Sequence, residues 1–111
     1  MSRTDLMRGT LDLLLLRALI TGPYHGLGVA RRVEQITQGA FRVNPGSLFP
    51  ALHRLEQKGW LAAEWGRSET NRKAKFYELT SAGRRHTEEE ARNWKRVSVA
   101  IELALRDVGE A

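Results

Sequence analysis

Residues 44–59 read NPGSLFPALHRLEQKG, and this stretch decides the fold. Asn44 is a good helix N-cap, Pro45 a good first residue and Gly59 a good terminator. An apolar stripe with spacing i, i+3, i+4 and i+7 lies between them. The stripe consists of Leu48, Ala51, Leu52 and Leu55. Pro50 removes one helical hydrogen bond and is expected to bend or loosen the first turns. Because the stripe keeps its phase on both sides of this proline, the sequence predicts one amphipathic helix.

Two further helices are predicted before this stretch, over residues 10–20 and 26–38. Apolar residues recur at helical spacing in both. Gly22 and Pro23 end the first helix, and Gly39 ends the second. The alternation in Phe41, Arg42 and Val43 predicts a brief strand between the second helix and the third.

A β-hairpin is predicted after the third helix. Leu61, Ala63 and Trp65 alternate within residues 60–65, and residues 73–79 contain Phe76 and Tyr77. A polar segment rich in turn formers separates the two strands. A last helix then starts at Thr80 or Ser81 and runs to about Val108. The predicted fold is therefore mainly α with a small β-hairpin, a winged helix-turn-helix over residues 1–80 followed by one long helix over residues 81–111.

The last helix carries an apolar seam with spacing 3, 4, 3, 4, as at the a and d positions of a coiled coil. We expect this seam to pair two copies of the chain, with help from the first helix. The expected dimer contacts are Leu11, Leu15, Trp94, Val97, Ile101, Ala104, Leu105 and Val108.

Composition limits the class of protein. The 111 residues allow one domain and little more. With 41% apolar and 28% charged residues, the chain has the composition of a folded domain rather than a disordered one. No cysteine is present, which excludes disulfides and thiolate metal sites. The longest apolar run, residues 13–16, is too short for a membrane span, and no signal-peptide pattern opens the chain. We expect a cytoplasmic protein.

The net charge of +5 is uneven along the chain. Residues 1–59 hold eight Lys and Arg against four Asp and Glu, whereas residues 80–111 hold six of each. A basic first half with a balanced tail is typical of a module that binds a polyanion. A generally basic protein with no such partner is the alternative.

The side of residues 44–59 opposite the apolar stripe is polar or basic, and we expect it to enter the major groove of double-stranded DNA. The expected contact residues are Ser47, Phe49, Pro50, His53, Arg54, Gln57 and Lys58. Arg54 suits either a bidentate contact to guanine or a phosphate. A solvated helix face is the alternative for the whole set.

The hairpin tip and the start of the second helix form the other expected DNA contact, to phosphates or the minor groove. The residues are His25, Arg67, Asn71, Arg72, Lys73 and Lys75. His25 caps the second helix or faces a phosphate. The histidines show no metal-ligand spacing, and no catalytic constellation is present, so we expect no metal, no cofactor and no enzyme. Four aromatic residues suit core, interface or a small-molecule pocket, namely Trp60, Trp65, Tyr77 and Trp94.

The motifs GTLDLL at residues 9–14, GPYHG at 22–26, GSLFPALHRLE at 46–56 and NRKAKFY at 71–77 resemble the PadR family of bacterial transcriptional regulators. The resemblance covers nearly the whole chain and implies a dimeric repressor, often of a neighbouring gene, which a small molecule or regulatory signal releases. It implies the short-tailed subgroup with one C-terminal helix. The family commonly has tyrosine at the position of Phe49, so a phosphate contact from that hydroxyl is absent here.

Other classes remain open at this point. The rivals are a MarR-like regulator, a non-specific nucleoid or RNA-binding protein, and a winged-helix adaptor for protein interactions. The basic helix face and hairpin argue against the adaptor. The narrow major groove of double-stranded RNA excludes a helix, which argues against RNA.

Overall fold

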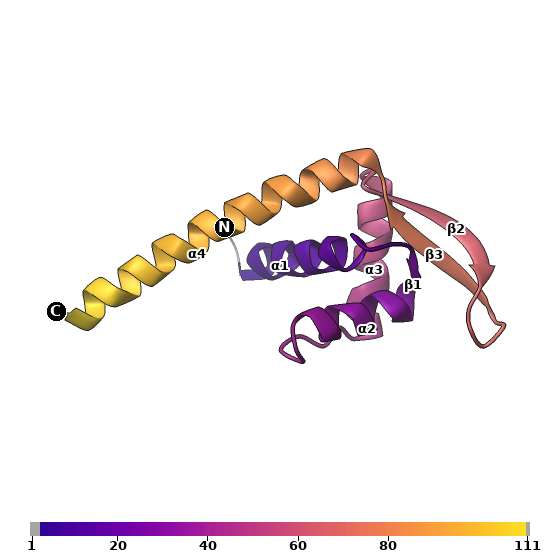
Figure 1. Cartoon of the computed structure of the whole chain (residues 1–111), viewed down its shortest axis with the longest axis horizontal. Helices are drawn as coiled ribbons and strands as arrows, with labels where there is room; N and C mark the ends of the chain where they lie inside the picture. The colour runs from indigo at the N-terminus through magenta and orange to yellow at the C-terminus, as the bar shows by residue number, and fades with distance from the viewer. Residues whose placement is uncertain (1–2, 111) are drawn as a thin grey trace.

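The chain folds in the order helix, strand, helix, helix, two strands and helix (Figure 1). The structure, a computed structural model, describes residues 3–110, with side chains from residue 8 to residue 106. The elements in that range are α1 Arg3–Ala18, β1 Tyr24–His25, α2 Gly26–Ile36, α3 Pro45–Gln57, β2 Leu61–Arg67, β3 Lys73–Leu79 and α4 Ser81–Glu110. The predicted fold class, a mainly helical winged helix with one long C-terminal helix, is confirmed.

Two local expectations were wrong, and one strand was missed. Helix α1 begins at Arg3 and ends at Ala18, two residues before the predicted end. Residues 41–43 form no strand and cross irregularly into α3. Strand β1, at Tyr24 and His25, was not predicted. A strand of two residues is too short to show an alternating pattern in the sequence. Strand β1 forms because β3 lies beside it and pairs with it.

The sheet is antiparallel with the order β1-β3-β2. Tyr24 pairs with Tyr77, while β2 and β3 pair from Leu61 opposite Leu79 out to Arg67 opposite Lys73. Alternate residues of a strand point to opposite faces. One face of the hairpin therefore covers the helices near its base and continues past them towards the tip.

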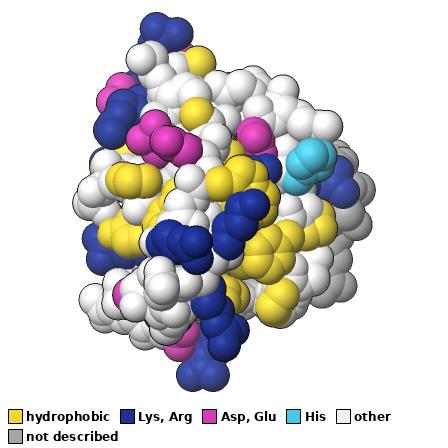
Figure 2. Space-filling model, turned by 90° about the vertical axis from the view of Figure 1, so that its right-hand side faces the viewer, with side chains coloured by type: hydrophobic (Ala, Val, Ile, Leu, Met, Phe, Trp, Pro, Cys, Tyr) yellow, Lys and Arg dark blue, Asp and Glu magenta, His cyan; other side chains and the backbone are white. Residues whose placement is uncertain are grey.

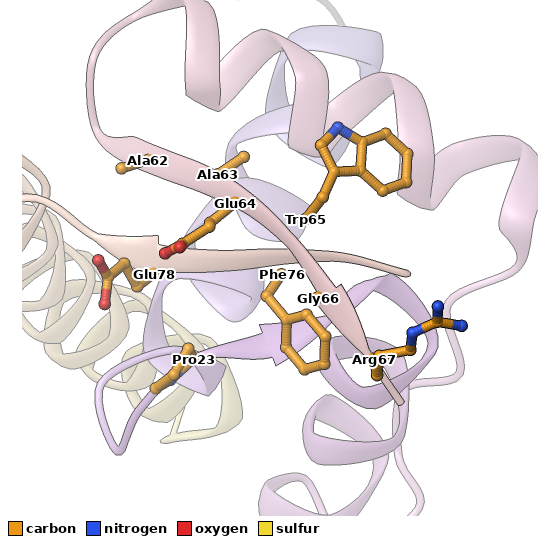
Figure 3. Close-up of a pocket in the computed structure, with 9 residues that line it drawn as sticks. All are labelled: Pro23, Ala62, Ala63, Glu64, Trp65, Gly66, Arg67, Phe76 and Glu78. Atoms are coloured by element: carbon orange, nitrogen blue, oxygen red, sulfur yellow. The ribbon is translucent and has the colours of Figure 1, made fainter. Parts of the chain in front are cut away.

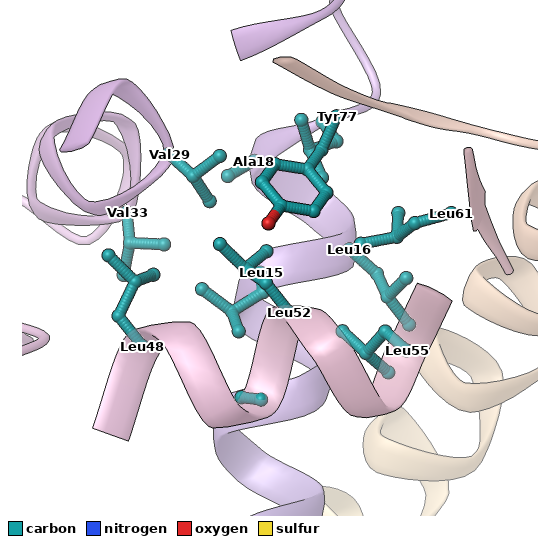
Figure 4. Close-up of a cluster of buried hydrophobic side chains, with 12 residues drawn as sticks. Leu15, Leu16, Ala18, Val29, Val33, Leu48, Leu52, Leu55, Leu61 and Tyr77 are labelled. Atoms are coloured by element: carbon teal, nitrogen blue, oxygen red, sulfur yellow. The ribbon is translucent and has the colours of Figure 1, made fainter. Parts of the chain in front are cut away.

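The core lies between α1, α2, α3 and the base of the hairpin (Figure 4). Leu15 of α1, Val29 of α2 and Leu52 of α3 meet there with no exposed surface. Leu61 and Tyr77 close it from the sheet. The apolar stripe predicted for residues 44–59 is buried as expected, and it fixes the opposite face of α3 as the outer one.

Helix α3 continues through Pro50 without interruption. The side chain of Asn44 accepts a hydrogen bond from the Ser47 N–H at 2.9 Å, which confirms the predicted N-cap. Pro50 lies on the exposed side of the helix. The Gly46 carbonyl that it leaves without a helical partner therefore faces water, which makes the proline tolerable there.

Helix α4 is joined to the hairpin through Thr80 and Gly83. Thr80 Oγ1 accepts from the Gly83 N–H at 3.0 Å and donates to the Gly59 carbonyl at 2.7 Å, so Thr80 is the cap. A Cβ at Gly83 would lie 2.1 Å from the Trp60 carbonyl oxygen, so only glycine fits. His86 stacks on Trp60, with ring centroids 3.5 Å apart, rather than standing in solvent.

The second half of α4 leaves the rest of the molecule and runs past the start of α1 (Figure 1). Every side chain of residues 95–106, which we call the tail, is exposed. Within residues 3–110, none of the helices combines the length and hydropathy that a bilayer crossing requires.

Candidate nucleic-acid interface

The outer face of α3 is the centre of the candidate interface. Pro50, His53 and Gln57 are exposed on the side of α3 opposite its buried stripe, and we call these three residues the reading face. Lys58 follows at the C-cap, with Nζ 4.9 Å from the centre of the Trp60 ring. This arrangement presents one imidazole and one amide side chain to a groove, both able to hydrogen-bond base edges.

Arg54 does not point outward with the reading face, which corrects the expectation from helical projection. Its guanidinium donates to the carboxylate of Asp12 in α1. The Arg54 side chain is only 27% exposed and the Asp12 side chain 15%. Arg54 sits on the flank of α3 that faces α1, where a carboxylate from 42 residues earlier in the chain meets it.

Ser47 lies on the same flank of α3. It is exposed, but it lines a hollow of about 400 Å³ with Thr10, Leu11 and Leu14 of α1 and with Phe41 from the loop. Ser47 therefore borders the reading face rather than standing at its centre.

The start of α2 lies beside the tip of the hairpin. His25 Nδ1 accepts from the Gly28 N–H at 3.2 Å, so His25 is the N-cap of α2, one of the two roles predicted for it. An acceptor at Nδ1 leaves the ring proton on Nε2, which lies 3.6 Å from a Glu69 carboxylate oxygen. Arg31 lies 3.6 Å from the other oxygen of Glu69. A backbone N–H at Glu69 is the main cause that lowers the pKa of Glu69 below its usual value. Desolvation opposes it in part, and His25 and Arg31 add smaller lowering effects.

The basic residues of the wing differ in how free their charges are. Lys75 donates to Glu56 of α3 at 2.9 Å, which raises the pKa of Lys75, and its side chain is about one-third exposed. Lys73 is exposed, with Nζ 5.1 Å from the centre of the Trp65 ring. Lys73 thus presents more charge to a phosphate than Lys75 does.

The tip itself is compact. Arg67 donates to the Asn71 carbonyl at 3.3 Å, and Asn71 adopts a positive φ of 60° in the turn. Asn71 and Arg72 are exposed. The tip carries guanidinium groups on a hydrogen-bonded turn, which suits contact with phosphates.

An exposed apolar groove lies between α3 and the wing, and sequence reasoning did not find it. It has a volume of about 360 Å³ and is bordered by Leu27 of α2, Phe49 of α3 and Trp65 of β2. The space-filling view shows hydrophobic side chains among lysines and arginines on the wing end of the molecule (Figure 2). Only the packing of α2 and the wing on either side of Phe49 brings these residues together.

The other face of the wing has a different character. A hollow of about 440 Å³ lies there, lined by Phe76, Glu64 and Glu78 among others, with Trp65 and Arg67 also in its lining. Phe76 and Trp65 project to opposite sides of the hairpin (Figure 3). With two carboxylates and one guanidinium, this hollow favours a phosphate less than the opposite side of the wing, which carries Lys73 and Lys75.

The predicted dimer residues fall into three groups. Val97, Ile101, Ala104 and Leu105 are exposed on the tail, and Trp94 is half-buried where the tail begins. Leu11 is half-buried on α1, but Leu15 has no exposed surface, so the expectation that Leu15 faces a partner was wrong. The side chain of Val108 lies outside the described residues. Val99 and Leu103, which the seam pattern did not include, are also exposed, at 55% and 53%.

A helix-turn-helix of α2 and α3 followed by a β-hairpin defines a winged-helix protein, with α3 as its recognition helix. The model of the transcriptional regulator PadR-like family matches residues 15–89. The chain belongs to this family of DNA-binding transcriptional regulators.

Individual relatives agree with this assignment. A transcriptional regulator of Mycobacterium tuberculosis is 33% identical over 94% of this chain and 87% of its own length. A PadR family transcriptional regulator from Eggerthella lenta superposes with a TM-score of 0.75 at 27% identity, covering 92% of this chain and 87% of that one. A transcriptional regulator from Clostridium thermocellum shares the fold, with a TM-score of 0.77 at 24% identity over 88% of this chain and 95% of that one.

Proposed function

We propose that the protein is a homodimeric repressor that binds an inverted-repeat operator through the two copies of α3. Residues 1–80 bind DNA and residues 81–111 mainly hold the dimer together. In each half-site α3 lies in the major groove and the wing touches the flanking backbone or minor groove. Residues placed at the DNA are the reading face, with Ser47, Phe49 and Lys58 beside it, and the wing residues Arg67, Asn71, Arg72, Lys73 and Lys75.

The observation that carries the proposal is the exposed face of α3 next to a basic wing. The same chain also has a long helix, α4, whose tail exposes apolar side chains. The tail exposes Val97 at 42%, Ile101 at 52% and Leu105 at 68%. Apolar surface of this extent is unfavourable in water and favours burial against another copy. A two-fold dimer then presents two recognition helices, which explains the expected symmetry of the operator.

A selection from random duplexes with the purified protein tests DNA recognition. We expect one enriched inverted repeat, with half-site centres about one helical turn, or on the order of 10 base pairs, apart. Uniform recovery of all sequences would favour the nucleoid type of protein instead. A reporter gene placed behind the recovered operator then shows whether the bound protein lowers transcription, as a repressor must.

Release by a small molecule, which the family resemblance implies, belongs to the same proposal. The hollow beside Ser47 supports it, because the hollow is mostly apolar and Asn44, the cap of α3, lies on its rim. A ligand there would act on the start of the recognition helix. A set of small apolar compounds is the probe, scored by release of operator DNA, and failure of every compound to release it would contradict this part.

A further inference from the structure

The apolar groove between α3 and the wing is bordered by three large hydrophobic side chains that remain exposed. Leu27 is 53% exposed, Phe49 45% and Trp65 62%. Phe49 reaches the groove by lying over the start of α2, where a Cβ at Gly26 would come within 2.5 Å of its ring. Glycine at this position therefore lets α2 and α3 close up and sets Phe49 beside Leu27.

Polar groups at this edge of α3 are already engaged within the chain. Glu56, two turns after Phe49, binds Lys75 of the wing at 2.9 Å. Arg54 on the opposite flank binds Asp12. His53 and Gln57 remain on the reading face, and beside them at the wing edge of α3 the exposed side chain is the hydrocarbon ring of Phe49.

Two lysines lie on the rim of the groove, of which Lys73 is exposed and Lys75 is paired with Glu56. Lys73 Nζ lies 5.1 Å from the centre of the Trp65 ring, and Lys75 Nζ lies 5.5 Å from that of Tyr77. Lysines around an apolar groove match the surface of DNA, where phosphates flank the base edges. Among the base edges of the major groove, only thymine presents a methyl group, at its C5.

We propose that the groove of Leu27, Phe49 and Trp65 receives a thymine 5-methyl group in each half-site and so selects thymine at that position. The proposal rests on the proposed function and adds a specificity element to it. Leu27 and Phe49 contact the methyl group, and Trp65 excludes water on the wing side. Discrimination comes from burial of hydrocarbon and needs no hydrogen bond from the protein.

The test replaces thymine by deoxyuridine, one position at a time, in the duplex recovered by the selection described above. Deoxyuridine keeps the base pair and every hydrogen-bonding group and lacks only the methyl. We expect one position in each half-site at which the replacement weakens binding about fourfold, the effect of one buried CH₂-sized group.

Phe49→Ala and Leu27→Ala assign the effect to the groove. Each variant should bind the thymine and deoxyuridine duplexes equally at that position. The matched controls are Phe41→Ala, since Phe41 is 46% exposed on the other side of α3, and Ile36→Ala, since Ile36 is 39% exposed near the far end of α2. Both controls should keep the fourfold difference. Thermal melting shows which variants fold. If one groove variant fails to fold, the other groove variant and its matched control suffice for the test.

Equal binding of wild type to the two duplexes at every position overturns the proposal while leaving operator recognition intact. Persistence of the difference in folded Phe49→Ala and Leu27→Ala overturns it too, because the methyl is then read elsewhere. Failure of the protein to bind any duplex, or to enrich any sequence, overturns the proposed function and this inference with it.

Discussion

The winged-helix body and the tail of α4 contain similar apolar residues, but the body buries them and the tail leaves them exposed. In the body, Leu15, Val33 and Leu52 are fully buried against one another's helices. In the tail, Ile101 and Leu105 remain more than half exposed. The body completes its core within one chain, whereas the tail leaves apolar surface exposed, which the proposed dimer would bury. Substitutions in the two regions should therefore differ in whether their effects depend on protein concentration.

The largest expected effect belongs to the body. Leu52→Ala leaves a cavity among α1, α2 and α3 and should lower the free energy of unfolding by about 2–5 kcal/mol. Chemical denaturation at several protein concentrations measures it. The decrease in the free energy of unfolding should be the same at every protein concentration. The variant should also bind operator and scrambled DNA more weakly to the same extent. A loss that disappears at high concentration would place Leu52 at the dimer interface instead.

The next effect tests the tail. Ile101→Asp introduces a carboxylate into the expected seam and should weaken dimerisation by about tenfold or more, since burying an unpaired charge is costly. Sedimentation equilibrium measures it. Val99→Asp is the control, because Val99 is similarly exposed but lies two residues away and points to the other side of α4. Equal loss in both variants would mean that the partner covers the whole tail rather than one seam.

Arg54→Met tests the ion pair that joins α3 to α1. It leaves the Asp12 carboxylate half-buried without its cation and should lower the free energy of unfolding by about 1–3 kcal/mol. A double-mutant cycle with Asp12→Asn isolates the pair. Since Arg54 belongs to the body's internal contacts, its loss should weaken operator and scrambled DNA equally. If Arg54→Met lost affinity for the operator alone, with its stability unchanged, Arg54 would instead contact a base.

A smaller effect distinguishes the two wing lysines. Lys73→Ala should reduce the slope of log affinity against log salt by about one for each phosphate contact removed. Lys75→Ala should reduce it less, because Glu56 already neutralises much of the Lys75 charge. Binding titrations across a salt series measure both, with the tail variant Lys95→Ala as control. If Lys73→Ala and wild type had equal salt slopes, the proposal that the wing contacts phosphates would be wrong.

The smallest effect concerns the contact of the wing tip with α2. The pKa of Glu69 is lowered from 4.5, so its ionised form contributes stability that is fully present above that pH and is lost as pH falls through the lower folded value. Glu69→Gln should therefore melt slightly below wild type at neutral pH. The two melting temperatures should converge in acid below the folded pKa. A difference that grows in acid would contradict the assignment.

Periodicity alone located α3, its cap at Asn44 and the hairpin, because those features depend on neighbours within a few residues. It misplaced the start of α1 and missed β1, whose two residues form a strand only through pairing with β3. It also placed Leu15 on a dimer surface. A helix as broadly apolar as α1 does not reveal which of its sides the rest of the chain covers.

The sequence by itself determined that this chain is a winged helix with a long apolar-seamed last helix, since local spacing specifies helices, turns and their buried faces. The tertiary structure alone decided which charges and side chains are free to act. Arg54 is engaged because α1 crosses beside it with Asp12, and Lys75 because the wing folds back on Glu56. Leu27, Phe49 and Trp65 form one groove because α2, α3 and β2 converge. Helical projection gives an angle around one axis, whereas these contacts depend on how separate axes cross.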